Sequence, residues 1–264
     1  MDIIGYFLAI LVGITLGLIG GGGSILTVPI LVYFFKINPE IATSYSLFIV
    51  GMTALFGSYR HYEMGNLNLK IALTFALSSV TSLLLVRNLL LPLVPKVIFS
   101  YGDFIITKQN LIMLIFSVLM IMASFSMIRP KEATVNQDSI NYLKLFNIGI
   151  LVGFVTGFLG AGGGFLIIPA LIYFAGLSMK KAVGTSLFII FINSMIGFVG
   201  DIIAGYTFDY TFLAIITSIA FVGMIIGTYL SKQINGNNLK PIFGWFILIM
   251  GIYIIIKEIS SQFS

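Results

Sequence analysis

Hydrophobic residues follow one another along this chain in eight long runs that contain no Asp, Glu, Lys or Arg. An α-helix needs about 20 mostly apolar residues to span a bilayer, and a core helix of a soluble protein is usually shorter. The pattern therefore predicts an all-α integral membrane protein with several spanning helices. The uncharged runs cover residues 3–35, 41–59, 71–86, 109–128, 145–179, 182–200, 210–231 and 241–256.

The first half of the chain is repeated in the second half at a distance of 140 residues. Residues 11–57 align without a gap on residues 151–197, with 18 identities in 47 positions. Shared apolar composition alone would give scattered Leu and Ile matches, whereas here glycines, Pro29 and Ser46 coincide with their counterparts Pro169 and Ser186. The sequence thus predicts two tandem copies of one unit, as in many secondary transporters.

Polar residues separate the two copies. Residues 129–144 form the longest polar stretch, which we interpret as a linker between a first membrane repeat at 1–128 and a second at 145–264. A less polar connection at 87–108 has only a short counterpart in the second copy, at 231–240. We therefore expect residues 87–108 to be a peripheral insertion.

Each copy opens with its longest uncharged run, and the middle of that run is rich in glycine. A continuous helix of this length would reach about 50 Å, beyond a hydrocarbon core of about 30 Å, yet it is too short to cross twice. Each glycine inside a helix costs about 1 kcal/mol relative to alanine, so a cluster should open the helix. We expect two half-helices that meet inside the membrane at Gly20, Gly21, Gly22, Gly23 and Ser24 in the first copy, and at Gly160, Gly162, Gly163 and Gly164 in the second.

Such breaks can bind an anion without a basic side chain. The first amides of a new half-helix have no intrahelical partner, and its dipole places about half a positive charge there. Hydroxyl and amide groups of the following segment would add donors, although a hydroxyl in a membrane helix more often bonds a carbonyl of its own helix. The candidate substrate-binding residues outside the breaks are Ser44, Ser46, Thr185, Ser186 and Asn193.

Isolated glycines and ionisable residues receive simpler interpretations. The spacing of Gly13 and Gly17, and of their counterparts, is typical of close helix packing. His61 and Asp201 occupy equivalent places in the two copies, and we expect His61 at a water-exposed membrane edge. Neither has neighbours that could complete a metal site, and we expect no cofactor and no metal.

Composition excludes several classes of protein. Only 9% of the residues are charged, against roughly 25% in soluble domains. The net charge of +5 comes from Lys and Arg scattered between the apolar runs, which sets membrane topology and does not indicate a nucleic-acid partner. An intramembrane enzyme would need paired acids or a Ser/His constellation inside the spans, and the uncharged runs hold none. We therefore expect no enzymatic activity.

The copies can be inverted or parallel in the membrane. If each glycine-broken segment dips in and returns, three spanning helices follow it and the second copy enters from the opposite face. The 14 Lys and Arg then divide nine against five, compared with eight against six for parallel copies. The positive-inside rule favours the more unequal division, which puts both termini outside and the 129–144 linker in the cytoplasm.

Both copies carry the pattern G-x3-G-x2-G-x-G-G followed by a proline, and residues 182–187 read A-V-G-T-S-L. This doubled motif resembles the TauE/SafE family of sulfite exporters over nearly the whole chain, although residues 42–47 of the first copy depart from it. The resemblance implies a plasma-membrane secondary transporter of sulfite, a sulfonate or another organosulfur anion, with a proton or sodium as the coupling ion. A passive anion channel of the same fold remains an alternative, and the sequence does not fix the oligomeric state.

Overall fold

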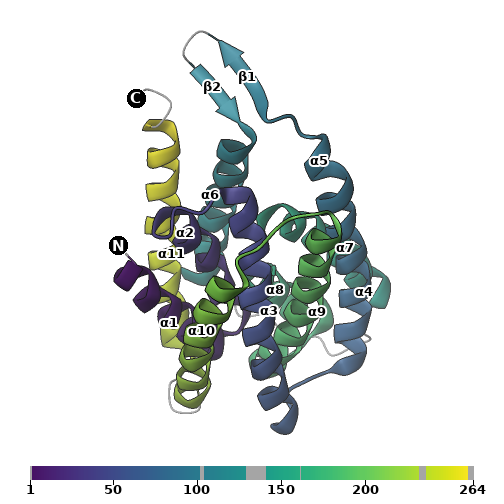
Figure 1. Ribbon diagram of the computed structural model, residues 1–264. Coiled ribbons are helices and arrows are strands. Elements are labelled where there is room, and N and C mark those ends of the chain that lie inside the picture. Colours follow the sequence, from purple (N-terminus) through teal and green to yellow (C-terminus); the bar gives the residue numbers. More distant parts are fainter. Residues whose placement is uncertain (1, 102–103, 129–140, 161, 232–235, 261–264) are drawn as a thin grey trace.

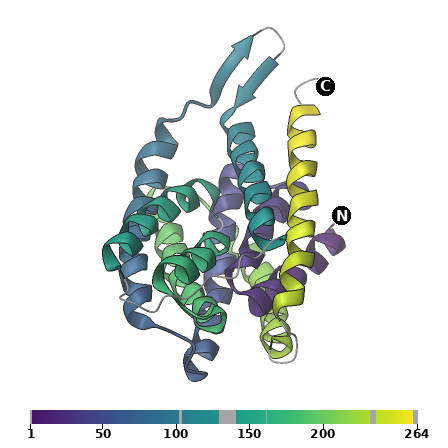
Figure 2. The same ribbon diagram turned by 180° about the vertical axis from the view of Figure 1, so that it is seen from behind.

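The protein is a bundle of helices from which one β-hairpin projects (Figure 1). The computed structural model describes residues 2–101, 104–128, 141–160, 162–231 and 236–260, so most of the expected 129–144 linker lies outside the described residues. The view from behind shows that the carboxyl end of the last helix lies at the same end of the bundle as the hairpin (Figure 2). That end is called the hairpin end below, and the other the opposite end.

The first half of the chain contains one broken helical segment, three long helices and the hairpin. Its elements are α1 (Asp2–Ile19), the 3-10 helix η1 (Gly21–Leu26), α2 (Thr27–Tyr33), α3 (Pro39–Glu63), α4 (Leu69–Leu85), the π-helical turn η2 (Val86–Leu90), α5 (Leu91–Leu93), β1 (Val97–Tyr101), β2 (Phe104–Thr107) and α6 (Lys108–Ile128).

The second half repeats this order without the hairpin. Its elements are α7 (Tyr142–Leu159), α8 (Gly164–Ala175), α9 (Met179–Ile203), α10 (Tyr210–Leu230) and α11 (Gly236–Ser260). Among the described residues, six helices are long and apolar enough to cross a membrane: Pro39–Glu63, Leu69–Leu93, Lys108–Phe125, Tyr142–Leu159, Met179–Ile203 and Tyr210–Leu230. The expectation of an all-α membrane protein is therefore confirmed, with the hairpin as a small addition.

Short polar residues start the long helices. The side chain of Asn38 accepts a hydrogen bond from the amide of Glu40 at the start of α3, with Pro39 as the first helical residue. Asn68 and Asp209 cap α4 and α10 in the same way. Each cap pairs an amide that the helix itself cannot satisfy. These caps lie between apolar runs, so they fix where each membrane helix begins.

Helices α3 and α9 form the centre of the bundle and run antiparallel. Both are 25 residues long, and they occupy equivalent positions under the 140-residue shift. Gly51 of α3 lies against Ser194, Gly57 lies against Leu187, and Gly197 of α9 lies against Leu47. The contact partners move towards the start of α9 as the chain moves along α3, which is the signature of antiparallel packing.

Glycines also bring each broken segment onto a helix of the other half. A Cβ built on Gly13 of α1 would lie 1.9 Å from the carbonyl oxygen of Ala220 in α10. A Cβ built on Gly153 of α7 would lie 2.1 Å from the carbonyl oxygen of Ser79 in α4. As the spacing of Gly13 and Gly17 predicted, these glycines allow two backbones to approach closely.

Each broken segment returns to the end from which it came. Tyr6, near the start of α1, stacks edge-on against Phe35, which follows α2, with ring centroids 5.4 Å apart. In the second half, Lys70 lies 4.9 Å above the ring of Tyr142 at the start of α7. Gly184, in the second turn of α9, packs against Asn66 in the loop before α4. The segment α1–α2 thus begins and ends at the hairpin end, and α7–α8 begins and ends at the opposite end.

The close approach of α1 and α10 gives a direct test of this packing. In a Gly13→Ala variant the new methyl group would meet the Ala220 carbonyl, and only a separation of the two backbones can relieve that contact. We expect a loss of about 1–3 kcal/mol, the usual cost of overpacking, seen as a lower melting temperature in detergent. Gly65→Asn is the matched control, since Gly65 has a φ of +69° and nothing within 4 Å of a built Cβ. Equal stability of Gly13→Ala and the parent protein would contradict the close approach.

Candidate functional site

The two glycine breaks touch each other inside the bundle. In the first copy Gly20 has a φ of 76°, after which the chain turns into η1 and continues as α2. In the second copy Gly160, Gly162 and Gly163 all have positive φ before α8 begins at Gly164. A Cβ built on Gly21 would lie 2.1 Å from the Cα of Gly164, so only glycine allows the two backbones to meet here.

The helix that follows each break begins differently in the two copies. In the second copy α8 is α-helical from Gly164. The first copy resumes as a 3-10 helix at Gly21, which also contains Gly22 and Gly23, and becomes α-helical at Thr27. The hydroxyl of Ser24 donates to the carbonyl of Gly21 at 2.7 Å, which closes this tighter turn.

Each break also packs against the long central helix of the other half. Gly20 lies against Val183 of α9, with 2.9 Å between a built Cβ and Cγ1. Gly160 lies 2.4 Å from the carbonyl oxygen of Thr43 in α3, measured in the same way. A Cβ built on Gly162 would lie 2.8 Å from the hydroxyl oxygen of Ser194. The crossing is therefore enclosed by α3 and α9, as non-helical backbone inside a membrane requires.

Several candidate hydroxyls are held by protein partners. The Ser186 hydroxyl donates to the carbonyl of Val183 in its own helix at 2.8 Å. The Thr185 hydroxyl accepts from the amide of Asn68 at 3.1 Å. Ser44 accepts from Arg87 at 2.9 Å. Ser186 thus follows the alternative in which a membrane hydroxyl bonds its own helix.

Three other polar side chains near the breaks have a free donor. The Ser46 hydroxyl, the Asn193 amide nitrogen and the Ser194 hydroxyl are fully buried and have no hydrogen-bond partner among the described residues. The amide oxygen of Asn193 is occupied, because the Ser79 hydroxyl donates to it at 2.9 Å. An unpaired buried donor costs about 1–3 kcal/mol, and an anion would satisfy it.

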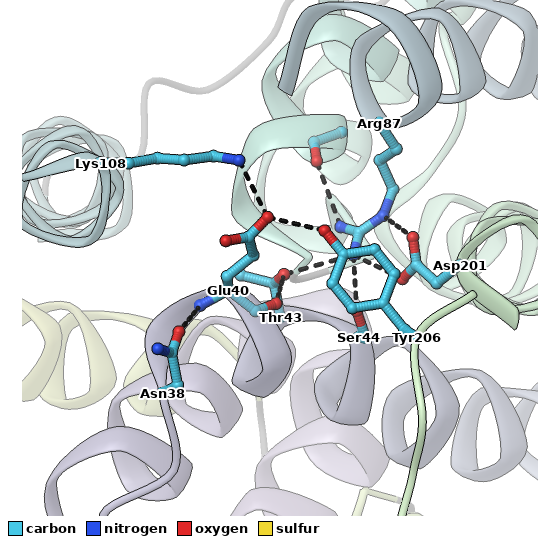
Figure 3. Close-up of polar contacts among 9 residues, drawn as sticks. Asn38, Glu40, Thr43, Ser44, Arg87, Lys108, Asp201 and Tyr206 are labelled. Carbon is cyan, nitrogen blue, oxygen red and sulfur yellow. Dashed lines mark hydrogen bonds and ion pairs between the residues drawn. The ribbon is translucent and has the colours of Figure 1, made fainter. Parts of the chain in front are cut away.

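A buried ion pair joins Arg87 to Asp201, and polar contacts surround it (Figure 3). The guanidinium of Arg87 meets the carboxylate of Asp201 with two contacts, Nε to Oδ1 at 2.7 Å and Nη2 to Oδ2 at 2.5 Å. Both side chains are 3% exposed. Arg87 also donates to the hydroxyls of Thr43 and Ser44 and to the carbonyl of Gly157. The pair therefore ties α3, η2, α7 and α9 together.

A second set of contacts extends this cluster towards the surface. The phenol of Tyr206 donates to a carboxylate oxygen of Glu40 at 2.6 Å, and the ammonium of Lys108 reaches the same oxygen at 2.9 Å. Burial, and then the hydrogen bond to Glu40, raise the pKa of Tyr206 above its ordinary value. The phenol therefore stays protonated and remains a donor at neutral pH.

A pocket of about 520 Å³ opens beside the ion pair at the hairpin end. Arg87, Asn88 and Tyr206 supply its polar lining, so one face of the buried cluster borders an open space. Its remaining walls are Pro92 and residues 200 and 203–205.

Two expectations about ionisable residues were wrong. We expected Arg87 in a peripheral insertion, whereas among the described residues of that segment strands β1 and β2 project from the bundle and Arg87 is buried within it. We expected His61 at a water-exposed membrane edge, but its exposed fraction is only 7%. Asp201 pairs with Arg87, a partner that the alignment of the two copies did not indicate. A signal for Arg87 was present, because it is the only charge between Lys70 and Lys96, and a lone charge in an apolar run points to a buried functional site.

Known proteins resemble this chain over almost its full length. The family described as "Sulfite exporter TauE/SafE" matches residues 6–254. A probable membrane transporter protein of Xylella fastidiosa (strain Temecula1) is 30% identical over 262 residues, which cover 95% of this chain and 94% of the relative. The probable membrane transporter protein YunE of Bacillus subtilis is 26% identical over 280 residues, covering 96% and 97%. No solved structure matches the chain.

The extent of these matches agrees with the doubled glycine motif, the two broken segments and the membrane-length helices. The relatives are transporters and not enzymes by their names. The chain belongs to the sulfite exporter TauE/SafE family of multi-pass membrane transporters.

Proposed function

We propose that this protein is a secondary transporter of a small anion, namely sulfite, a sulfonate or a related organosulfur anion. The anion binds where the two glycine-broken helices cross, near the middle of the bilayer. Membership of the family supports a transporter of a small substrate. The choice of an organosulfur anion rests on the name of the family and on the chemistry of the crossing.

The observation that carries this proposal is the group of unpaired donors around the crossing. Ser46, Asn193 and Ser194 each offer a buried hydrogen that no described residue accepts. The half-helix α8 adds a positive dipole end at Gly164. Donors without acceptors, together with a positive helix end, favour an anion over a cation.

Close contact between the breaks favours a transporter over a passive channel. The backbones of Gly21 and Gly164 touch, so an anion can occupy the crossing only when the two half-helices separate. A carrier that alternates between two conformations includes such a separation in its cycle. A channel of the same fold would need a continuous path through this point.

We further infer that the two halves are inverted repeats. Equivalent helices α3 and α9 pack antiparallel, and the broken segments return to opposite ends of the bundle. Three crossings then follow each broken segment: α3, α4 with α5, and α6 in the first repeat, and α9, α10 and α11 in the second. By the positive-inside rule the opposite end faces the cytoplasm and the hairpin end faces outward.

Flux measurements with purified protein in liposomes test the proposed activity. We expect radiolabelled sulfite or taurine to accumulate above its equilibrium level when a proton or sodium gradient is imposed, and to equilibrate slowly without one. A thermal-shift screen with sulfite, sulfate, thiosulfate, taurine, sulfoacetate and chloride identifies the best anion, since a bound ligand raises the melting temperature. Fast equilibration that ignores every gradient would instead identify a channel.

The two equivalent serines provide a matched pair for the binding site. Ser46→Ala removes a hydroxyl without a partner, so we expect it to weaken anion binding by about 0.5–1.5 kcal/mol, roughly two- to twelvefold in Kd. Ser186→Ala removes a hydroxyl that is already bonded to its own helix, and we expect it to leave Kd unchanged. The measurement is a thermal-shift titration with the best anion of the screen. An unchanged Kd in Ser46→Ala would place the anion elsewhere.

Single cysteines test the inversion, because the chain has no native cysteine. Met64 and Ala204 are equivalent under the 140-residue shift, follow α3 and α9 directly, and are exposed. We expect Met64→Cys and Ala204→Cys to react with a membrane-impermeant thiol reagent from opposite sides of sealed vesicles. Reaction of both from one side would show parallel repeats.

A further inference from the structure

We propose that the Arg87–Asp201 ion pair is the gate that closes the hairpin end of the transport path. The anion opens it by replacing the Asp201 carboxylate on the Arg87 guanidinium. This inference rests on the proposed function, because it assigns a second anion-binding position on the path to the same crossing. It makes Arg87 the first charged ligand that an anion meets at this end.

The position of the pair is that of a gate. On its outer side, Arg87 lines the pocket of about 520 Å³ at the hairpin end. On its inner side, the Thr43 that receives a hydrogen bond from Arg87 also lies against Gly160 at the break. Gly157, whose carbonyl accepts from Arg87, is three residues before Gly160 in the same segment. One layer of side chains therefore separates the open pocket from the crossing.

The pair also joins parts that must separate if the two halves move relative to one another. Arg87 belongs to the first half and Asp201 to the second, and the bond from Arg87 to the carbonyl of Gly157 links the same two halves. Breaking these contacts would release α9 and α7 from η2. The intact cluster thus stabilises one arrangement of the two halves, and its contacts would break in another arrangement.

Energetics favour a functional role for these charges over a structural one. Burying two charges inside a membrane protein is costly, and well-packed apolar residues of similar volume often serve stability equally well. The guanidinium fork of arginine binds planar and tetrahedral oxyanions through two parallel hydrogen bonds. The Nε and Nη2 donors that now hold the Asp201 carboxylate therefore suit a sulfite or sulfonate equally well.

The opposite end of the bundle carries no such pair at the equivalent positions. His61 stands in place of Asp201, and Gly184 stands in place of Ser44. The capping residues Asn68 and Asp209 are 141 positions apart, because the loop before α10 is one residue longer than the loop before α4. With this offset, Thr228 is the counterpart of Arg87. The ring nitrogen Nδ1 of His61 and the hydroxyl of Thr228 have no hydrogen-bond partner among the described residues. Of these two sets of equivalent positions, the one at the hairpin end therefore holds an ion pair and the one at the opposite end does not.

A cysteine beyond the gate can report its opening. Ser194→Cys replaces a buried hydroxyl beside Gly162 in this cysteine-free chain. The reagent is a charged, membrane-impermeant methanethiosulfonate, applied from the side on which Ala204→Cys is labelled. In the Asp201→Asn background Arg87 loses its counter-charge, and we expect the labelling rate of the reporter to rise at least tenfold. His61→Gln changes the equivalent position in the first repeat and should leave the rate from this side unchanged.

The second arm tests whether an anion opens the gate. Methanesulfonate, which does not react with the reagent, should raise the labelling rate of the reporter severalfold in the parent background, whereas the uncharged analogue dimethyl sulfone should not. In the Arg87→Met/Asp201→Leu variant, where apolar side chains fill the space of the pair, the response to methanesulfonate should disappear. This variant also covers the case in which Asp201→Asn does not fold with its uncompensated Arg87.

Either of two results would overturn the gate. One is a labelling rate in Asp201→Asn equal to that of the parent, and the other is a methanesulfonate response that is absent in the parent or persists without Arg87. The liposome flux of the parent protein separates this failure from failure of the proposed function. Gradient-driven uptake with an unresponsive reporter rejects the gate alone, whereas a responsive reporter without any uptake rejects the transport proposal alone.

Discussion

The whole architecture depends on one constraint, which is that a helix broken inside a membrane must have its backbone enclosed by protein. Water is absent there, so peptide groups that leave the helical pattern need protein partners. This chain meets the constraint by placing its two breaks against each other at Gly21 and Gly164. The central helices α3 and α9 enclose the crossing, and α1 and α7 each pack on a helix of the other half. Neither half could enclose its own break alone, which explains why the unit occurs twice.

A second constraint concerns charge. Among the described residues that glycine-rich packing brings to the crossing, none is basic, so the donors there are amides and hydroxyls. The one buried guanidinium among the described residues stands instead at the edge of the crossing, where a single carboxylate neutralises it. Under the proposed function, this separation would keep the binding site at the crossing weakly polar, so that a bound anion could leave it as readily as it enters.

Features of the fold that depend on the local spacing of residues were predictable from the sequence. The lengths of the apolar runs predicted the membrane helices, and the glycine clusters predicted the breaks. The spacing of Gly13 and Gly17 predicted a helix-packing face. Three-dimensional partners were not predictable in this way. Ser46 and Ser186 are equivalent in sequence, yet only Ser186 has an acceptor. Likewise, Arg87 and Asp201 lie 114 residues apart, and only the folded chain brings them together.

The two copies are equal in position but unequal in local structure, and the sequence explains the inequality. Ser24 closes a 3-10 turn through its hydroxyl, whereas its counterpart Gly164 has no hydroxyl and follows three glycines with positive φ. Different side chains at other matched positions likewise place the Arg87–Asp201 ion pair at the hairpin end and His61 with Thr228 at the opposite end. A strictly symmetric pair of repeats would have identical energies in its two inverted conformations. Under the proposed transport cycle, differences at these few positions would allow one conformation to be favoured, and an anion that competes for Arg87 would act on that difference directly.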